Sequence, residues 1–162
     1  MSRFHGARQR GFTIVELVVT VAILGVLATG ALPLAELVIQ RQKEQELRLA
    51  LREIRGAIDA YKRAVDEGRV NRAADATGFP ESLDALAVGT RDMRSTEKQM
   101  IYFLRRVPRD PFEPDASLPA AATWGLRSYA SPPEDPQPGK DVFDVYSRAP
   151  GTGLNGQPYR AW

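Results

Sequence analysis

Residues 39–68 read IQRQKEQELRLALREIRGAIDAYKRAVDEG, and the spacing of their apolar side chains decides the fold. These side chains recur every three or four residues, which places them on one face of an α-helix. The stripe consists of Leu47, Ala50, Leu51, Ile54, Ala57, Ile58, Tyr61 and Val65. Arg, Lys and Glu occupy the opposite face, and Gly68 follows as a candidate C-cap. The pattern predicts an amphipathic helix whose stripe must be covered by the rest of the chain.

The helical pattern continues upstream into a segment without charged residues. Residues 17–35, LVVTVAILGVLATGALPLA, span about 28 Å as a helix, close to a hydrocarbon core of about 30 Å. We therefore expect one helix from residue 12 to about residue 66. Its hydrophobic, membrane-spanning half is residues 12–39, and its amphipathic half is residues 40–67.

Gly25, Gly30 and Pro33 interrupt the pattern in the hydrophobic half of this helix. Gly30 is a poor helix former, and Pro33 removes a backbone donor and clashes with the preceding turn. The sequence therefore predicts a kink or loosened turn around Gly30 and Pro33. The alternative is an ordinary tolerated proline of a membrane helix.

A short basic tip precedes the hydrophobic run. It carries Arg3, Arg8 and Arg10, which predicts a cytoplasmic N-terminus by the positive-inside rule. Without residues 1–11 the chain would hold 22 − 3 = 19 basic and 20 acidic residues, so no nucleic-acid partner is expected. A removed secretory signal peptide is the alternative, but its apolar region is shorter, about 7–15 residues.

The chain has no Cys, and its single His is His5 in the tip. Disulfides, thiolate nucleophiles and Cys-ligated zinc are excluded, and the body lacks the usual general base near pH 7. Asp110, Glu113 and Asp115 form a loop cluster of carboxylates, but acids between prolines are ordinarily only solvated. We therefore expect no enzyme and no catalytic residue.

The remaining residues, 68–162, must supply the domain that covers the stripe. GFPESLDAL, 78–86, and STEKQMIYFLRRVP, 95–108, each predict a short helix. WGLRSYAS, 124–131, and DVFDVYS, 141–147, predict two antiparallel strands. The fold class is α+β: a long N-terminal helix packed on a small domain with short helices and an antiparallel β-sheet. The aromatic side chains expected on the stripe are Trp124, Tyr129, Phe143, Tyr146 and Trp162.

Residues 11–16 read GFTIVE and lie between the basic tip and the apolar run. With Pro33 following Phe12 by 33 − 12 = 21 residues, this arrangement resembles the type IV prepilin-type signal, shared by type IV pilins and type II secretion pseudopilins. The resemblance implies a pilin-like fold, cleavage between Gly11 and Phe12 by prepilin peptidase, and N-methylation of Phe12. Gly11 suits a scissile bond because it has no side chain.

Glu16 places a carboxylate at the start of the apolar segment, where an isolated charge costs several kcal/mol. After cleavage Phe12 carries a new α-amino cation. The resemblance implies that Glu16 pairs with this amine, commonly on the neighbouring subunit, during assembly. The alternative is a carboxylate that sits near the helix start because the helix dipole favours it there.

Two later segments resemble the major, G-type pseudopilin of type II secretion. YFLRRVPRDPF, residues 102–112, is similar to that family's "YLxxxPxDPW" region, and residues 141–147 with Trp162 are similar to its C-terminal strand and loop. The resemblance implies a single-pass subunit of the bacterial inner membrane with a periplasmic globular part. It also implies a periplasmic filament that drives protein export across the outer membrane. Implied partners are further copies, other pseudopilins, prepilin peptidase, the inner-membrane assembly platform and membrane lipid.

Two alternative functions remain open. A type IV pilus subunit is the first, although such chains often carry a C-terminal Cys pair that this chain lacks. A single-span membrane-anchored enzyme or binding protein is the second. Arg105, Arg106 and Arg109 form a basic cluster that fits lipid headgroups, a neighbouring subunit's acids or simply a solvated face.

The C-terminal loop departs from the family pattern. G-type pseudopilins usually bind calcium there through acidic side chains and carbonyls, but residues 147–162 contain no Asp or Glu. Asp144 and Asn155 remain as candidate calcium ligands. Calcium takes about six to eight oxygens, and its affinity depends on how many carry charge. We therefore expect no required cofactor and a loop that is ordered without calcium.

Overall fold

The computed structural model describes residues 11–73, 76–97 and 99–162, apart from the side chains of residues 29–34. The chain divides into two compact units, which we call the N-terminal unit, Met1–Gln40, and the C-terminal unit, Arg41–Trp162. Most of the predicted leader lies outside the described residues. The backbone of residues 29–34 is helical, and the kink predicted at Gly30 and Pro33 stays a prediction.

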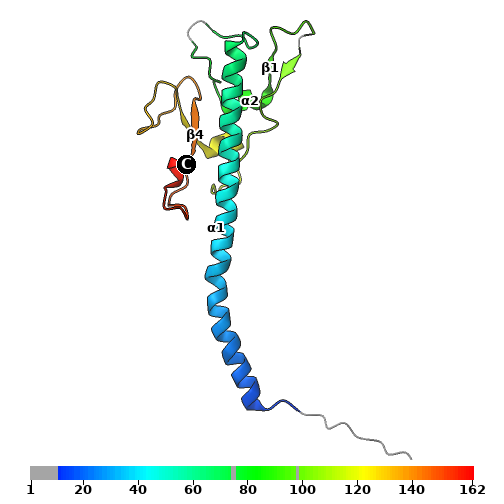
Figure 1. Ribbon diagram of the computed structural model, residues 1–162, viewed down its shortest axis with the longest axis vertical. Coiled ribbons are helices and arrows are strands. Elements are labelled where there is room, and N and C mark those ends of the chain that lie inside the picture. Colours follow the sequence, from blue (N-terminus) through cyan, green and yellow to red (C-terminus); the bar gives the residue numbers. More distant parts are fainter. Residues whose placement is uncertain (1–10, 74–75, 98) are drawn as a thin grey trace, which may run out of the picture. The chain divides into compact units, whose positions relative to one another are not determined.

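The predicted long helix is confirmed. Helix α1, Ile14–Asp66, has 53 residues and belongs to both units (Figure 1). It ends as the sequence predicted, because Gly68 adopts a φ of +68° that other residues rarely tolerate. The Gly68 N–H then bonds to Val65 O at 2.9 Å, and the Arg69 N–H bonds to Ala64 O at 2.8 Å. These two bonds satisfy carbonyls at the end of the helix that would otherwise lack a partner.

The apolar stripe of α1 is buried in the C-terminal unit. All of its predicted members except the half-buried Tyr61 are buried, and Leu47 and Ile54 are completely inaccessible. The covering side chains come from segments spread along the rest of the chain: Leu83, Leu86, Leu104, Val107, Trp124, Val142, Val145 and Tyr159. The stripe from Leu47 to Ile58 and these side chains form one core, whereas Val65 packs with Ala64 and Val70 in a second, smaller cluster.

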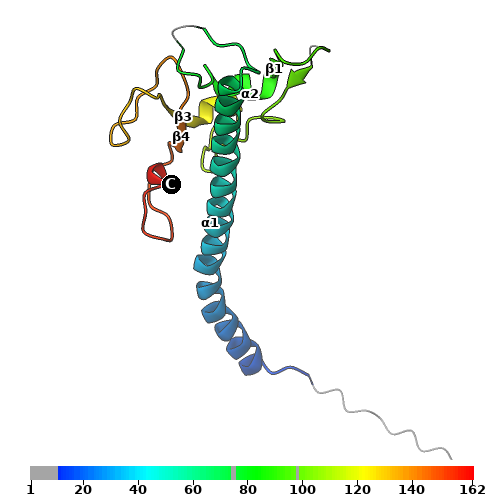
Figure 2. The same ribbon diagram turned by 45° about the horizontal axis from the view of Figure 1, so that its top comes forward.

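The first predicted short helix is present as α2, Leu83–Val88. It starts later than Pro80, because the Ser82 hydroxyl accepts the Ala85 N–H at 3.3 Å and caps it. In Figures 1 and 2, α2 lies beside the C-terminal part of α1. Leu83 and Leu86 enter the core from α2.

The prediction of a second short helix at residues 95–108 is wrong. The segment instead contains strand β2, Met100–Ile101, which pairs antiparallel with β1, Thr90–Arg91. The N–H groups of Phe103 and Leu104 both donate to the Leu86 carbonyl, at 3.0 and 2.9 Å. A helix would have used these donors internally, so the tertiary contact with α2 decides the backbone here.

The two later strands are confirmed. Strand β3, Trp124–Arg127, pairs antiparallel with β4, Asp144–Ser147, with Trp124 opposite Ser147. Short 3₁₀ helices precede β3 at Ala120–Thr123 and end the chain at Tyr159–Ala161. In both ribbon views the β3–β4 pair and the β1 strand lie to different sides of α1 (Figure 2).

The prediction for the aromatic residues is correct only in part. Trp124 is fully buried in the core, and Trp162 packs against its edge. Tyr129 instead stacks on Phe79 at a ring-centroid distance of 5.6 Å, and Phe143 meets Phe79 edge-to-face at 4.9 Å, in a cluster at the surface. Tyr159 fills the core in their place, because the end of the chain folds back onto α1.

Truncation of the stripe tests this account of the core. We expect Leu47→Ala to lower the free energy of unfolding by about 2–5 kcal/mol, because it leaves a cavity in a fully buried site. Leu49→Ala is the matched control, because Leu49 lies on the same helix but is 59% exposed, and it should change stability by less than about 0.5 kcal/mol. Denaturant unfolding of the purified chain measures both values, and equal losses would contradict the assignment of the core.

Candidate functional site

The peptide bond between Gly11 and Phe12 lies outside secondary structure. Residues 11–13 are irregular, and α1 begins at Ile14. Gly11 is exposed with open space around it, and the Phe12 side chain is 79% exposed. An exposed, non-helical peptide is the kind of segment that proteases cut. The local geometry is therefore compatible with cleavage after Gly11.

Glu16 lies in the first turn of α1. Its backbone N–H donates to the Thr13 hydroxyl at 3.2 Å, so Thr13 caps the helix. The sequence interpretation missed the role of Thr13, although the spacing Thr13-x-x-Glu16 is the signature of a capping box. The start of α1 is thus set two residues after the predicted cleavage site, and the Glu16 carboxylate interacts favourably with the helix dipole.

The N-terminal unit exposes apolar side chains over its described length. Examples are Ile14, Val15, Val18, Leu24, Val26 and Val38, each at least 59% exposed. Within the described residues, none of the helices has an apolar stretch long enough to cross a membrane. The span predicted at residues 17–35 includes residues 29–34, whose side chains are not described, and stays a prediction.

The segment at residues 102–112 has a structural role centred on Asp110. This carboxylate is 2% exposed, and it accepts the Ser147 hydroxyl of β4 and the Phe112 N–H at 2.8 Å. Its own N–H donates to the Thr123 hydroxyl at 3.1 Å. Nearby, Trp124 Nε1 donates to Pro108 O at 2.8 Å. These bonds fasten the 108–112 segment to both strands of the β3–β4 pair.

The neighbouring charged residues organise the same loop. Hydrogen bonds from the Ser117 hydroxyl and N–H hold the pKa of Asp115 below its usual range. This shift moves the pKa of Asp115 away from the near-neutral range in which general acid–base catalysis is most efficient. Arg109 donates to the carbonyls of Leu118 and Asp115, the latter at 2.7 Å, whereas Arg105 and Arg106 are exposed.

Comparison with known proteins finds one matching family model and two similar proteins. Residues 6–32 match the family model of the prokaryotic N-terminal methylation motif. The chain is 30% identical over 112 residues to the type II secretion system core protein G of Klebsiella pneumoniae, covering 68% of this chain and 74% of that protein. It is 29% identical over 140 residues to the protein of the same name from Pectobacterium carotovorum, covering 84% and 83%.

The chain belongs to the family of the type II secretion system core protein G. It is therefore a G-type pseudopilin, as the sequence motifs predicted. No solved structure matches the chain significantly. The names of both relatives describe a core protein of a secretion system, which is consistent with a structural component rather than an enzyme.

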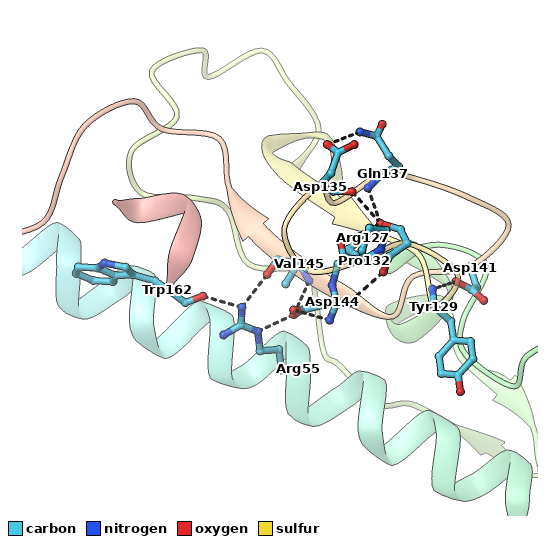
Figure 3. Close-up of polar contacts among 11 residues, drawn as sticks. Arg55, Arg127, Tyr129, Pro132, Asp135, Gln137, Asp141, Asp144, Val145 and Trp162 are labelled. Carbon is cyan, nitrogen blue, oxygen red and sulfur yellow. Dashed lines mark hydrogen bonds and ion pairs between the residues drawn. The ribbon is translucent and has the colours of Figure 1, made fainter. Parts of the chain in front are cut away.

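The calcium candidates of this pseudopilin do not fit a calcium ion. Asp144 Oδ1 lies 2.8 Å from Arg55 Nε, and Asp144 Oδ2 lies 3.4 Å from the Arg127 guanidinium (Figure 3). The Asn155 side-chain oxygen accepts the Gln157 N–H at 3.1 Å. Within the described part of the chain, no three His, Asp or Glu side chains gather as a metal site. Two guanidinium groups at the only candidate carboxylate repel a divalent cation.

The structural role of Asp110 can be tested by removing one acceptor oxygen. We expect Asp110→Asn to lower the free energy of unfolding by about 1–3 kcal/mol, because a buried donor at Ser147 or Phe112 loses its partner. Asp135→Asn is the matched control, because Asp135 is exposed and its carboxylate accepts from the exposed Gln137 side chain. Thermal unfolding of both variants gives the comparison, and a stable Asp110→Asn chain would contradict the assigned role.

Proposed function

We propose that this pseudopilin is a structural subunit of the type II secretion pseudopilus. Prepilin peptidase cleaves between Gly11 and Phe12, and Phe12 is then N-methylated. The subunits assemble through an inner-membrane platform, with other pseudopilins, into a periplasmic filament that drives protein export across the outer membrane. The observation that carries the proposal is the exposed apolar surface of the N-terminal unit, which directly follows an accessible Gly–Phe peptide.

The two halves of α1 have different roles in this proposal. Residues 12–39 lie in membrane lipid before assembly and form the filament core after it, because their apolar surface needs cover from outside the chain. Residues 40–67 are covered by the chain's own C-terminal part. The leader, 1–11, stays cytoplasmic until cleavage, and residues 68–162 form the periplasmic part.

Glu16 supplies the charge that guides assembly. Residues 11–40 contain no Lys, Arg or His, so no cation of this stretch can pair with it. Cleavage creates an α-amino group on Phe12, and the Glu16 carboxylate of one subunit pairs with this amine on its neighbour. A type IV pilus subunit would share this chemistry, but both relatives named above belong to secretion systems, which favours the pseudopilus.

The processing step is tested by the mass of the N-terminal peptide. Because residues 11–40 contain no Lys or Arg, trypsin should leave the new N-terminus on a peptide from Phe12 to Arg41. We expect this peptide to be heavier by about 14 Da, the mass added by one methyl group. Gly11→Val should keep the leader, because the added side chain blocks the scissile bond. A wild-type chain that retains Met1 or Ser2 contradicts the proposal.

The assembly step is tested by removing the carboxylate. Glu16→Leu should insert and be cleaved but form filaments at less than about one tenth of the wild-type level, because the amine loses its partner in an apolar core. Glu36→Leu is the matched control: it removes the other carboxylate of the apolar half, far along the helix from Phe12, and should still assemble. Electron microscopy after overproduction counts the filaments. Normal assembly of Glu16→Leu would defeat the pairing but leave the processing proposal intact.

A further inference from the structure

The C-terminal loop, which we define as residues 148–162, is held against α1 by an arginine. Arg55 Nε donates to Asp144 Oδ1 at 2.8 Å (Figure 3). Arg55 Nη2 donates to Val145 O at 3.0 Å and to Trp162 O at 2.7 Å. One guanidinium therefore contacts a carboxylate of β4, a carbonyl of β4 and the main-chain oxygen of Trp162 in the loop. These three groups are separated from Arg55 by 89 to 107 residues of chain.

These three oxygens converge on one point and repel one another there. A cation placed between them lowers this repulsion. Carboxylate and carbonyl oxygens are also the ligands that calcium takes. A guanidinium satisfies the same oxygens through its five N–H donors, and it stays charged at every physiological pH.

We propose that Arg55 is a built-in cation that replaces calcium as the organiser of the C-terminal loop in this pseudopilin. Asp144 is then the counter-charge of Arg55 and Arg127 rather than a metal ligand. The loop is ordered at any calcium concentration, because the cation that holds it is part of α1. The proposal concerns contacts within the C-terminal unit and does not depend on filament formation.

Two more side chains of α1 hold the same loop. The Glu44 carboxylate is 5% exposed and accepts the Leu154 N–H at 2.8 Å and the Tyr159 hydroxyl at 3.1 Å. The Arg48 guanidinium lies 4.3 Å from the centroid of the Trp162 ring, a cation–π contact. Positions 44, 48 and 55 are spaced by four and seven residues, so they share one side of the helix.

The loop is shaped to receive these contacts. Trp162 Nε1 donates to Gln157 O at 3.2 Å, which closes the loop on itself. A Cβ at Gly153 would lie 2.3 Å from the Trp162 ring, so only glycine allows this close approach. Glu44 thus fixes the middle of the loop, and Arg55 fixes its end. Both contacts are direct hydrogen bonds between α1 and the loop, and neither requires a metal ion.

The calcium part of the proposal is tested on the wild-type chain. The purified full-length protein in detergent is heated with millimolar calcium and, separately, with a chelator. We expect thermal midpoints that agree within about 3 °C. Trypsin cleavage at Arg148 and Arg160, both exposed in the loop, should proceed at the same rate in the two buffers. A calcium-dependent rise in the midpoint or in loop protection overturns the proposal.

The arginine part is tested with a matched pair of variants. Arg55→Met keeps the aliphatic stem but removes the donors, and it should speed cleavage at Arg148 or Arg160 by about tenfold or more. Arg52→Met is the control, because Arg52 is exposed one turn away and donates only to Arg48 O of its own helix. It should be cut at the wild-type rate. A loop that is equally protected in Arg55→Met and the wild type overturns the proposal.

A conservative variant keeps the test decisive if Arg55→Met fails to fold. Arg55→Lys retains the charge but loses the planar fork that reaches three oxygens at once. We expect its loop to be cut faster than the wild-type loop while its midpoint stays insensitive to calcium. Loop protection equal to that of the wild type would show that a simple positive charge suffices and would refute the specific role of the guanidinium.

Discussion

The contact between the apolar stripe of α1 and the segments that cover it is the interaction on which the C-terminal unit depends. An amphipathic helix gains most of its stability from packing its apolar face. The two sheets have only two strands each, and such pairs are marginal in water by themselves. Each part therefore gains stability from packing against the other. Trp124 of β3 and Val145 of β4 therefore reach the same core as Leu47 and Ile54 of α1.

The same helix meets a different requirement in its first half. From Ile14 onward the apolar side chains are exposed around the helix, with no covering segment from the chain in the described residues. A surface of this kind needs lipid or other protein molecules. The first half of α1 is apolar on all sides and needs cover from its surroundings. The second half has one apolar stripe, which the chain covers by itself.

Local patterns predicted those parts of the structure that local physics controls. The three- and four-residue spacing predicted α1 and its stripe, and Gly68 predicted its end. The segment at 95–108 was misread because its apolar residues fit a helix face, while a bond from Phe103 to Leu86 decides its backbone. Thr13 as a cap was readable from its spacing to Glu16 and was overlooked.

The parts that could not be predicted are contacts between residues far apart in sequence. Arg55 and Asp144 are 89 residues apart, and Glu44 and Leu154 are 110 residues apart. No local spacing relates such residues, so the sequence identified Arg55 and Glu44 only as members of a polar helix face. For the same reason Asp144 read as a candidate metal ligand, whereas the folded chain places two arginines beside it.

The buried acids of this pseudopilin share one physical task. Glu44, Asp92, Asp110 and Asp141 are all buried, and each accepts a backbone N–H. Much of the chain after α1 is irregular, and backbone donors there cannot be satisfied by a long strand ladder. Carboxylates supply the missing acceptors, and Arg55 supplies donors to carbonyls in the same way. A metal ion could also order such loops, but its contribution would vary with its free concentration. Side chains of the chain itself make loop order a property of the sequence alone.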